Sequence, residues 1–206
     1  MDERLTKQLA FALELDKEKS VFRRTHLSGP GRLENDAEHA WHMAIMAYLL
    51  REYSDEKIDI ARVLIMCLIH DVVEIYAGDT YCYDAEGVKT QKAREEAAKE
   101  KIFALLPDDQ RAELTAIFDE FEAGETLEAR FAHAMDNMQP LLLINSNDGC
   151  DWKDNGISAD KVYRRQGRTR LGSERLFEAT DAILRENIRK GNLYWEDPEG
   201  KENKDV

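Results

Sequence analysis

The feature that most restricts the fold of this chain is an apolar segment with an ionisable pair in its middle. Residues 58–77 predict one helix that ends near Gly78, and IARVLIMCLIHDVVEIYAG is apolar almost all round. A helix without a polar face belongs at the centre of a bundle. His70 and Asp71 are therefore expected to be buried, and a buried carboxylate is costly unless it is paired or bound to a metal.

A third ionisable residue lies on the same helix face. Glu74 follows Asp71 by three residues, so their carboxylates are neighbours. Adjacent carboxylates repel each other and favour a cation between or beside them. A salt bridge inside the bundle is the alternative interpretation, but few basic residues are near, and Arg62 lies more than two turns away.

Two other segments supply residues that could complete a metal site. In LENDAEH, Asn35 with Glu38 has the spacing of a capping box, and His39 would lie in the first turn of a helix. In RFAHAMDNMQPLL, Asp136 is another carboxylate in a mostly apolar helix. His39 alone is more typical of a cap region than of a ligand. Together with the His-Asp pair and Asp136, it indicates a metal site in the core of a bundle.

Such a site suits a divalent ion. Its two neutral imidazoles and two carboxylates would carry two negative charges, from His39, His70, Asp71 and Asp136. Mixed nitrogen and oxygen ligands suit Mn, Fe, Co, Ni or Zn better than Mg alone. We therefore expect one divalent metal ion, with its identity open among Mn, Co, Zn, Fe, Ni and Mg.

Nearly every segment has the apolar spacing of a helix, and no run alternates strictly enough to predict a strand. Pro140 should kink its helix or end it early. The sequence thus predicts one all-α domain, a helical bundle over residues 1–195 with a polar tail at 196–206. The expected helices are 2–20, 36–53, 58–77, 89–106, 108–123, 126–147 and 159–190, with loops at 20–34, 79–87 and 147–158.

Charge and composition exclude some functions. The 206 residues carry a formal net charge of −13, which argues against binding to a nucleic-acid backbone, because that needs clustered Lys and Arg. An anionic substrate must accordingly be held by a local cation. The N-terminus lacks the pattern of a signal peptide, and the longest apolar run, 63–69, is too short to span a membrane. Three widely spaced cysteines fit a reducing cytoplasm.

These motifs, in this order, resemble those of a known family. The pattern is carried by AEH (37–39), HDVVE (70–74), AGD (77–79) and AMDN (134–137). It is similar to the H…HD…D pattern of the HD-domain metal-dependent phosphohydrolases. The stretch from about Arg24 to Asn137 most resembles the small bacterial 5′-deoxynucleotidases. The resemblance implies a bundle of the HD-domain type, hydrolysis of a phosphate ester and a homodimer.

The resemblance also implies a role for each matching residue. The metal ligands fall on His39, His70, Asp71 and Asp136. The catalytic carboxylate falls on Glu74, the phosphate-orienting arginine on Arg24, and an acid that contacts the substrate on Asp79. Arg23 would replace Arg24 if the register were shifted by one. Where the nucleotidases have a tryptophan, this chain has Thr25, which leaves a preference for 2′-deoxynucleotides open.

Some residues keep a structural alternative. Asp79 follows Gly78 and is equally typical of a turn. His42 and His133 are expected in the core rather than as ligands. The basic cluster RRQGRTR, from Arg164 to Arg170, could fold over the site as a phosphate-binding lid, but a solvated basic face is the favoured interpretation.

The chemistry follows from these residues. A bound divalent ion polarises a phosphoryl oxygen, Glu74 acts as a general base or relays a proton, and an arginine compensates the phosphate charge. We predict a metal-dependent phosphohydrolase that cleaves a phosphomonoester of a small molecule, with a nucleoside 5′-monophosphate as the leading substrate. The alternatives are a triphosphate or cyclic nucleotide as substrate, and a non-catalytic module that binds a metal or a nucleotide.

Overall fold

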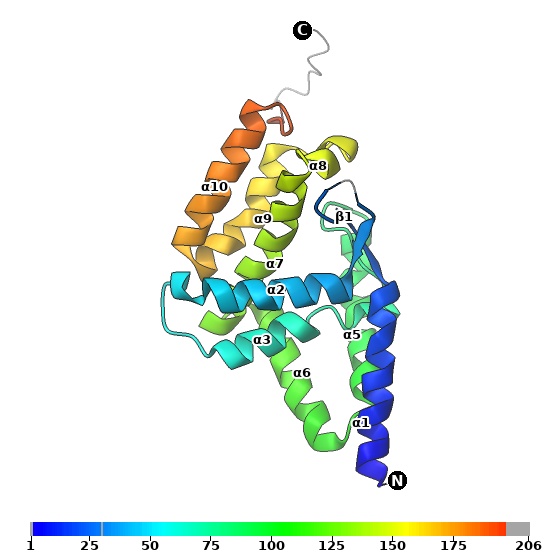
Figure 1. Ribbon diagram of the computed structural model, residues 1–206. Coiled ribbons are helices and arrows are strands. Elements are labelled where there is room, and N and C mark those ends of the chain that lie inside the picture. The colour runs from blue at the N-terminus through cyan, green and yellow to red at the C-terminus, as the bar shows by residue number, and fades with distance from the viewer. Residues whose placement is uncertain (1, 30, 197–206) are drawn as a thin grey trace.

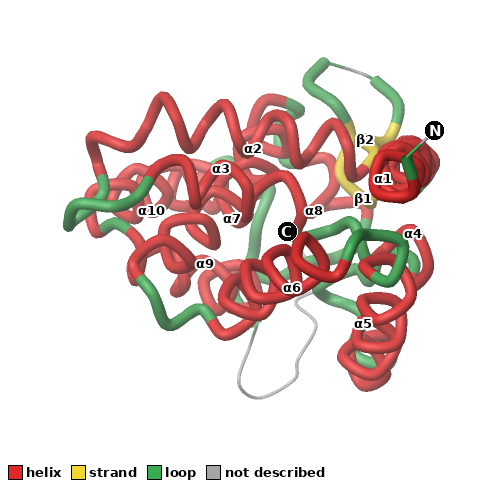
Figure 2. Tube along the Cα trace, turned by 90° about the horizontal axis from the view of Figure 1, so that it is seen from below, coloured by secondary structure: helices red, strands yellow, loops and turns green. Residues whose placement is uncertain are grey.

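The computed structural model describes residues 2–29 and 31–196. The described part of the chain is a bundle of helices with one short hairpin, as Figures 1 and 2 show. In chain order, its helices and strands are α1 (Glu3–Glu14), β1 (Phe22–His26), β2 (Leu33–Asn35), α2 (Asp36–Leu50), α3 (Ile60–Ile69), α4 (Glu74–Ala77), α5 (Gly87–Phe103), α6 (Asp108–Ala123), α7 (Leu127–Ser146), α8 (Cys150–Asp154), α9 (Ala159–Gly172) and α10 (Glu174–Arg189), with short 3-10 helices at Leu15–Ser20 and Arg51–Tyr53.

Helix α7 is the central element of the bundle. It packs against α9, α2 and α3, and α10 packs against α9 (Figure 1). Helices α5, α6 and α1 lie toward the other end of the molecule, and α1 runs beside the hairpin (Figure 2). Segments far apart in the sequence therefore meet around α7. The all-α prediction is confirmed, apart from the hairpin.

The centre of the core lies between α2, α3 and α7. Met43, Met66, Phe131 and Met135 are fully buried there. Burial of a side chain of this size contributes about 1.5–3 kcal/mol, so this layer is a main source of stability. Methionine is flexible and fills irregular gaps, which suits a layer that packs against polar side chains.

The close packing of α9 against α7 depends on a glycine. A Cβ atom at Gly172 would lie 2.3 Å from the carbonyl oxygen of Arg130 and 3.0 Å from Cβ of Ala134. Because any larger residue would collide with the backbone of α7, glycine allows α9 to pack this closely. The contact holds α9 against the part of α7 that carries Asp136.

The predicted single helix over 58–77 is wrong, because the helix breaks in its middle. Helix α3 ends at Ile69, and α4 begins at Glu74. Between them, the N–H groups of Val72 and Glu74 donate to carbonyl groups three residues earlier, at 3.3 and 2.8 Å, as in a 3-10 turn. The ionisable pair thus lies in a tight turn, and its side chains need not follow one helix face.

The expected loop at 20–34 contains a β-hairpin that the sequence did not predict. Strand β1 pairs with β2 in antiparallel fashion, with Phe22 opposite Asn35. Along β1, Arg23 is partly buried while Arg24 is exposed, because successive side chains of a strand point to opposite faces. Two strands this short show no alternation that a sequence pattern could reveal.

Further helix boundaries also differ from the prediction. The helix expected at 2–20 is α1 followed by a 3-10 helix, and the loop expected at 147–158 contains α8. The helix expected at 159–190 is broken at Ser173, whose backbone is extended. Its hydroxyl accepts a hydrogen bond from the N–H of Leu176 at 3.1 Å and thereby caps the start of α10.

Helix α7 continues through Pro140 to Ser146, so the proline does not end the helix early. Pro140 has no N–H to donate to the carbonyl of Asp136, four residues earlier. Residues 197–206 of the expected polar tail lie outside the described residues. Over the described ranges, the helices are too short or too polar to cross a membrane.

Candidate metal centre

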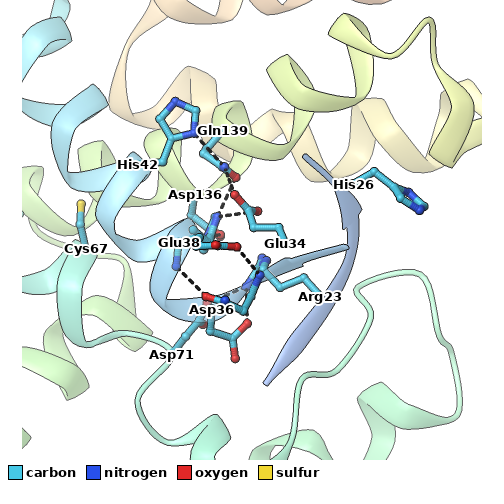
Figure 3. A network of polar contacts seen from close by, with 12 residues as sticks. Arg23, His26, Glu34, Asp36, Glu38, His42, Cys67, Asp71, Asp136 and Gln139 are labelled. Carbon is cyan, nitrogen blue, oxygen red and sulfur yellow. Dashed lines mark hydrogen bonds and ion pairs between the residues drawn. The ribbon is translucent and has the colours of Figure 1, made fainter. Parts of the chain in front are cut away.

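The candidate centre begins with two histidine rings that are held in the same way. Nδ1 of His39 lies 2.7 Å from Oε1 of Gln139, and Nδ1 of His70 lies 3.0 Å from the carbonyl oxygen of Cys67. Because both oxygens can only accept, Nδ1 is the donor in each ring. In the neutral ring, Nε2 then carries no proton and is available as a metal ligand. Figure 3 shows the polar side chains around the centre, with Gln139, Glu34, Asp71 and Asp136 labelled.

The two Nε2 atoms meet a carboxylate from α7. The ligand atoms of His39, His70 and Asp136 all lie within 4.8 Å of one another, and Nε2 of His39 is 3.3 Å from Oδ1 of Asp136. Nε2 of His70 is buried and makes no well-aligned hydrogen bond among the described residues, although Oδ2 of Asp71 lies 3.0 Å away. Three atoms that each offer an electron pair repel one another in the interior. A cation between them would remove this repulsion. These residues therefore fit a divalent metal ion.

Burial and neighbouring charges shift the pKa of each of these three residues. Burial lowers the pKa of His39 to about 4. Burial also opposes the charged form of His70, but the nearby Asp71 and Asp136 outweigh burial and raise the pKa of His70 to about 9. For Asp136, burial is outweighed by Arg165 and the two imidazoles, which hold its pKa well below the usual value. Asp136 is therefore ionised at neutral pH.

Asp71, the fourth predicted ligand, lies beside this group of three. Its Oδ2 atom is 3.0 Å from Nε2 of His70 and accepts a hydrogen bond of 2.7 Å from Nη1 of Arg23. The same nitrogen is 3.4 Å from Oδ1 of Asp36. Burial opposes ionisation of Asp71, but His70 and Arg23 outweigh it and lower the pKa. Arg23, rather than Arg24, is thus the guanidinium that contacts a predicted ligand.

A second group of acids adjoins the centre. The ligand atoms of Asp36, Glu74 and Asp79 lie within 4.8 Å of one another. Burial and the charge of Asp71 raise the pKa of Asp36 to about 8. The same two causes raise the pKa of Glu74 well above its usual value, and Oε2 of Glu74 is buried without a partner among the described residues. A carboxyl group that keeps its proton at neutral pH can act as an acid.

Arg24 lines a pocket beside these acids. The pocket has a volume of about 380 Å³, and its lining includes Arg24, Asp79 and two aromatic residues, Phe22 and Tyr81. The guanidinium carbon of Arg24 lies 5.7 Å from the centre of the Tyr81 ring. Thr25 is buried on β1 and is absent from the lining. The aromatic surface of the pocket therefore comes from other positions than residue 25.

The sequence analysis missed two residues that hold His39 in place. Gln139 is fully buried, and its Nε2 donates to Oε1 of Glu34 at 2.6 Å while its Oε1 accepts from the His39 ring. A chain of hydrogen bonds thus connects Glu34 to the ligand. Gln139 follows Asp136 by three residues, and this helical spacing places it on the ligand-bearing face. This three-residue spacing could have identified Gln139 from the sequence.

Two charged residues have a role other than the one the sequence suggests. Asn35 and Glu38 form the predicted capping box, and Asp36, which could also have capped this helix, is instead fully buried and lies beside Arg23 of the centre. Arg165 belongs to the basic cluster that is expected to be solvated, yet its Nη2 lies 3.3 Å from Oδ2 of Asp136. Its distance from the motif in the sequence hides this contact.

The remaining histidines lie outside the group of ligands. His133 is buried, and its Nε2 donates to the carbonyl of Phe121 at 2.8 Å. His42 approaches the far side of the Gln139 amide at 3.1 Å. His26 points away from the network in Figure 3. None of these three rings joins the convergent set in the described structure.

The structure is a helical bundle with a broken central helix and a His-His-Asp centre. Together these features define an HD-type domain. The HD domain family matches residues 15–176, and the chain belongs to this family. The resemblance seen in the sequence is therefore confirmed.

Among known proteins, the chain is similar in fold and sequence to a crystal structure described as a predicted metal-dependent phosphohydrolase from Magnetospirillum magnetotacticum MS-1. The identity is 46%, the TM-score is 0.89, and the match covers 93% of this chain and 96% of that one. The human 5′-deoxynucleotidase HDDC2 is 30% identical over 59% of this chain and 58% of its own length. A 5′-deoxynucleotidase from Enterobacter sp. (strain 638) is 26% identical over 46% of this chain and 51% of its own length. The chain thus spans little more than half the length of these curated relatives.

Proposed function

We propose that this protein is a metal-dependent phosphohydrolase that cleaves a phosphomonoester of a small molecule, and that its substrate is a nucleoside 5′-monophosphate. The observation that carries the proposal is the convergence of His39, His70 and Asp136 beside the buried carboxyl group of Glu74. The names of the relatives, 5′-deoxynucleotidases and a predicted metal-dependent phosphohydrolase, support the reaction and the substrate class.

The residues that would hold the metal are His39, His70, Asp71 and Asp136. Bound there, a divalent ion would polarise the phosphoryl group and lower the pKa of water. The mixed donor set favours Mn, Fe, Co, Ni or Zn. Gln139 and the carbonyl of Cys67 orient the two rings, so the protein itself fixes which nitrogen of each histidine faces the centre.

Glu74 supplies the acid–base group of the proposed reaction. Burial and the charge of Asp71 raise the pKa of Glu74 well above the usual value, which favours the protonated carboxyl group. Oε2 of Glu74 has no partner among the described residues, so this atom can deliver the proton to the leaving oxygen of the ester. The neighbouring Asp71 helps to maintain the high pKa, since its ionised carboxylate adds negative charge beside Glu74.

Arg24 and Asp79 line the pocket in which the leaving group would lie. Arg23 is engaged with Asp71 and Asp36, whereas Arg24 forms no carboxylate pair among the described residues. The guanidinium of Arg24 can therefore orient a phosphate oxygen, and Asp79 can accept a hydrogen bond from a sugar hydroxyl.

The test is release of free phosphate from a panel of ribo- and deoxyribonucleoside 5′-monophosphates by protein loaded with Mn²⁺, Co²⁺, Mg²⁺ or Zn²⁺. We expect release with at least one metal, and loss of more than 100-fold in kcat with Glu74→Gln, on the scale of general acid–base catalysis. Glu95→Gln is the control, because Glu95 is a half-buried glutamate whose side-chain hydrogen bond, among the described residues, is to Gln91.

The same panel separates the alternatives. Triphosphates and cyclic nucleotides are included, and preferential cleavage of either would replace the monophosphate as the substrate. A non-catalytic module would bind the metal and nucleotide without turnover, and Glu74→Gln would leave that binding unchanged. No phosphate release from any substrate with any metal would overturn the proposal of an enzyme.

We further propose a homodimer and a cytoplasmic location. Helix α2 exposes a stripe of large apolar side chains, Trp41, Ile45, Tyr48 and Leu49, with exposures of 45–63%, and a second copy of this chain would cover them. Light scattering should give the mass of a dimer for the wild type and of a monomer for Leu49→Glu. A monomeric wild type would refute the dimer. The cytoplasmic location rests on Cys67, Cys82 and Cys150, which are free thiols.

A further inference from the structure

One guanidinium outside the HD motif reaches the centre from α9. Nη2 of Arg165 lies 3.3 Å from Oδ2 of Asp136, and the Arg165 side chain is 29% exposed. It shares the inner face of α9 with Val162 and Gln166, which are buried. Its neighbour Arg164 is exposed and forms no ion pair among the described residues. Arg165 is thus the member of the basic cluster that enters the centre.

Most of the donors of Arg165 are uncommitted. A guanidinium has five N–H donors, and in the described structure the hydrogen bond to Asp136 is the one that Arg165 makes. Cys82 and Tyr83, in the loop after α4, lie close enough to affect its pKa. The remaining N–H groups therefore have no carboxylate partner among the described residues.

The geometry of Asp136 allows it to serve a cation and Arg165 at once. Its Oδ1 atom faces His39 at 3.3 Å, and its Oδ2 atom faces Arg165. The two oxygens thus point to different partners. A cation held by the first oxygen would reduce the negative charge that faces the guanidinium and so weaken its pairing with Asp136, which leaves more of the Arg165 donors for an anion.

The negative charge of a phosphate substrate calls for such a group. The carboxyl groups around the site include those of Asp36, Asp71, Glu74, Asp79 and Asp136. The guanidinium of Arg23 is engaged with two of them. A phosphate dianion that enters this acidic surrounding, in a chain of net charge −13, needs additional donors with positive charge.

We infer that Arg165 binds the phosphoryl group of the substrate, from α9, as a partner to Arg24 of β1. This inference rests on the proposed function, because it names a further substrate-binding residue of the same site. Arginine suits the role since its planar fork can donate two parallel hydrogen bonds to a phosphate. Lysine would retain the charge but not the fork.

The test compares Arg165→Gln and Arg165→Lys with Arg164→Gln, a neighbouring arginine of the same helix that faces solvent. For Arg165→Gln, we expect the KM for the best substrate to rise roughly 10- to 100-fold, on the scale of a charge-assisted hydrogen bond, with a smaller change in kcat. Arg165→Lys should recover part of this loss, and Arg164→Gln should behave as the wild type.

Two further measurements separate this inference from the proposed function. Calorimetric titration of the Mn²⁺-loaded protein with inorganic phosphate should show the same weakening for Arg165→Gln, whether or not the wild type turns over any ester. Metal content should equal that of the wild type. Phosphate affinity and KM equal to those of Arg164→Gln would overturn the inference. So would loss of the metal from Arg165→Gln, because Arg165 would then serve only to hold Asp136.

Discussion

Gln139 offers the sharpest test of how the fold prepares the centre. Its amide is fully buried and lies between the Nδ1 atom of His39, at 2.7 Å, and the carboxyl group of Glu34, at 2.6 Å. Replacement by methionine keeps the length and removes both hydrogen bonds. Two buried polar groups then lose their partner, each at a cost of about 1–3 kcal/mol, so the free energy of unfolding should fall by about 2–6 kcal/mol.

The change should also weaken metal binding. Without Gln139, no acceptor fixes the proton on Nδ1 of His39, and the ring is no longer held with Nε2 toward Asp136. Loss of a group that orients a ligand weakens metal affinity about 10- to 100-fold. Competition with a chelating dye for Mn²⁺ or Co²⁺ measures the affinity, and urea denaturation of the metal-free protein measures the stability.

Gln166 supplies the matched control. It is also buried, and its amide bonds to the carbonyl of Asn137 at 3.0 Å and to the hydroxyl of Thr169 at 2.8 Å, without contact to a ligand. Gln166→Met should lower stability by a similar amount and leave metal affinity unchanged. If Gln139→Met bound metal as tightly as Gln166→Met, the reasoning that this amide prepares His39 would be refuted.

Two further predictions concern stability. Burial and the charge of Asp71 raise the pKa of Glu18 from 4.5 to about 7, so its contribution to stability is present below pH 4.5 and is lost as the pH rises through 7. Glu18→Gln should therefore stabilise the metal-free protein by at most about 3 kcal/mol at pH 8 and by little at pH 4, as measured by urea denaturation; an unchanged pH dependence would contradict this. Gly172→Ala should cost about 1–3 kcal/mol because its Cβ would lie 2.3 Å from a carbonyl oxygen of α7, whereas Gly167→Ala, with nothing within 4 Å of the new Cβ, should add about 0.5–1 kcal/mol. Thermal unfolding that gave both variants the same sign of change would show that this contact is not tight.

Most helices, and the residues that converge as candidate ligands, could be predicted because each has a local signal. Apolar spacing predicts where helices such as α5, α6 and α7 lie, and burial of charged residues in apolar segments singles out His70, Asp71 and Asp136. His39 was weaker evidence alone and gained support only from the order of the motifs. The roles of these residues in metal binding remain predictions that the proposed experiments test.

The parts that could not be predicted depend on contacts between distant segments. The break between α3 and α4 contains neither proline nor glycine, and no local pattern marks it. The hairpin forms where Arg23 reaches Asp71, 48 residues later. Arg165 is separated from Asp136 by 29 residues and a helix break. A solvated basic helix and a helix with one inward arginine have the same local sequence pattern.

The arginines also explain why chemically identical acids take different roles in one site. Burial opposes ionisation of Asp71 and Asp136 as it does that of Asp36 and Glu74. The first two are nevertheless ionised, because guanidinium and imidazole groups contact them, and ionised carboxylates are what a metal needs. The other two have less compensation and are pushed toward the neutral form by the charge of Asp71, which leaves Glu74 with a proton to give. These contacts determine which carboxyl groups are protonated. Replacing an arginine by a neutral residue should therefore change the pKa values of the neighbouring acids even though every acid remains in place.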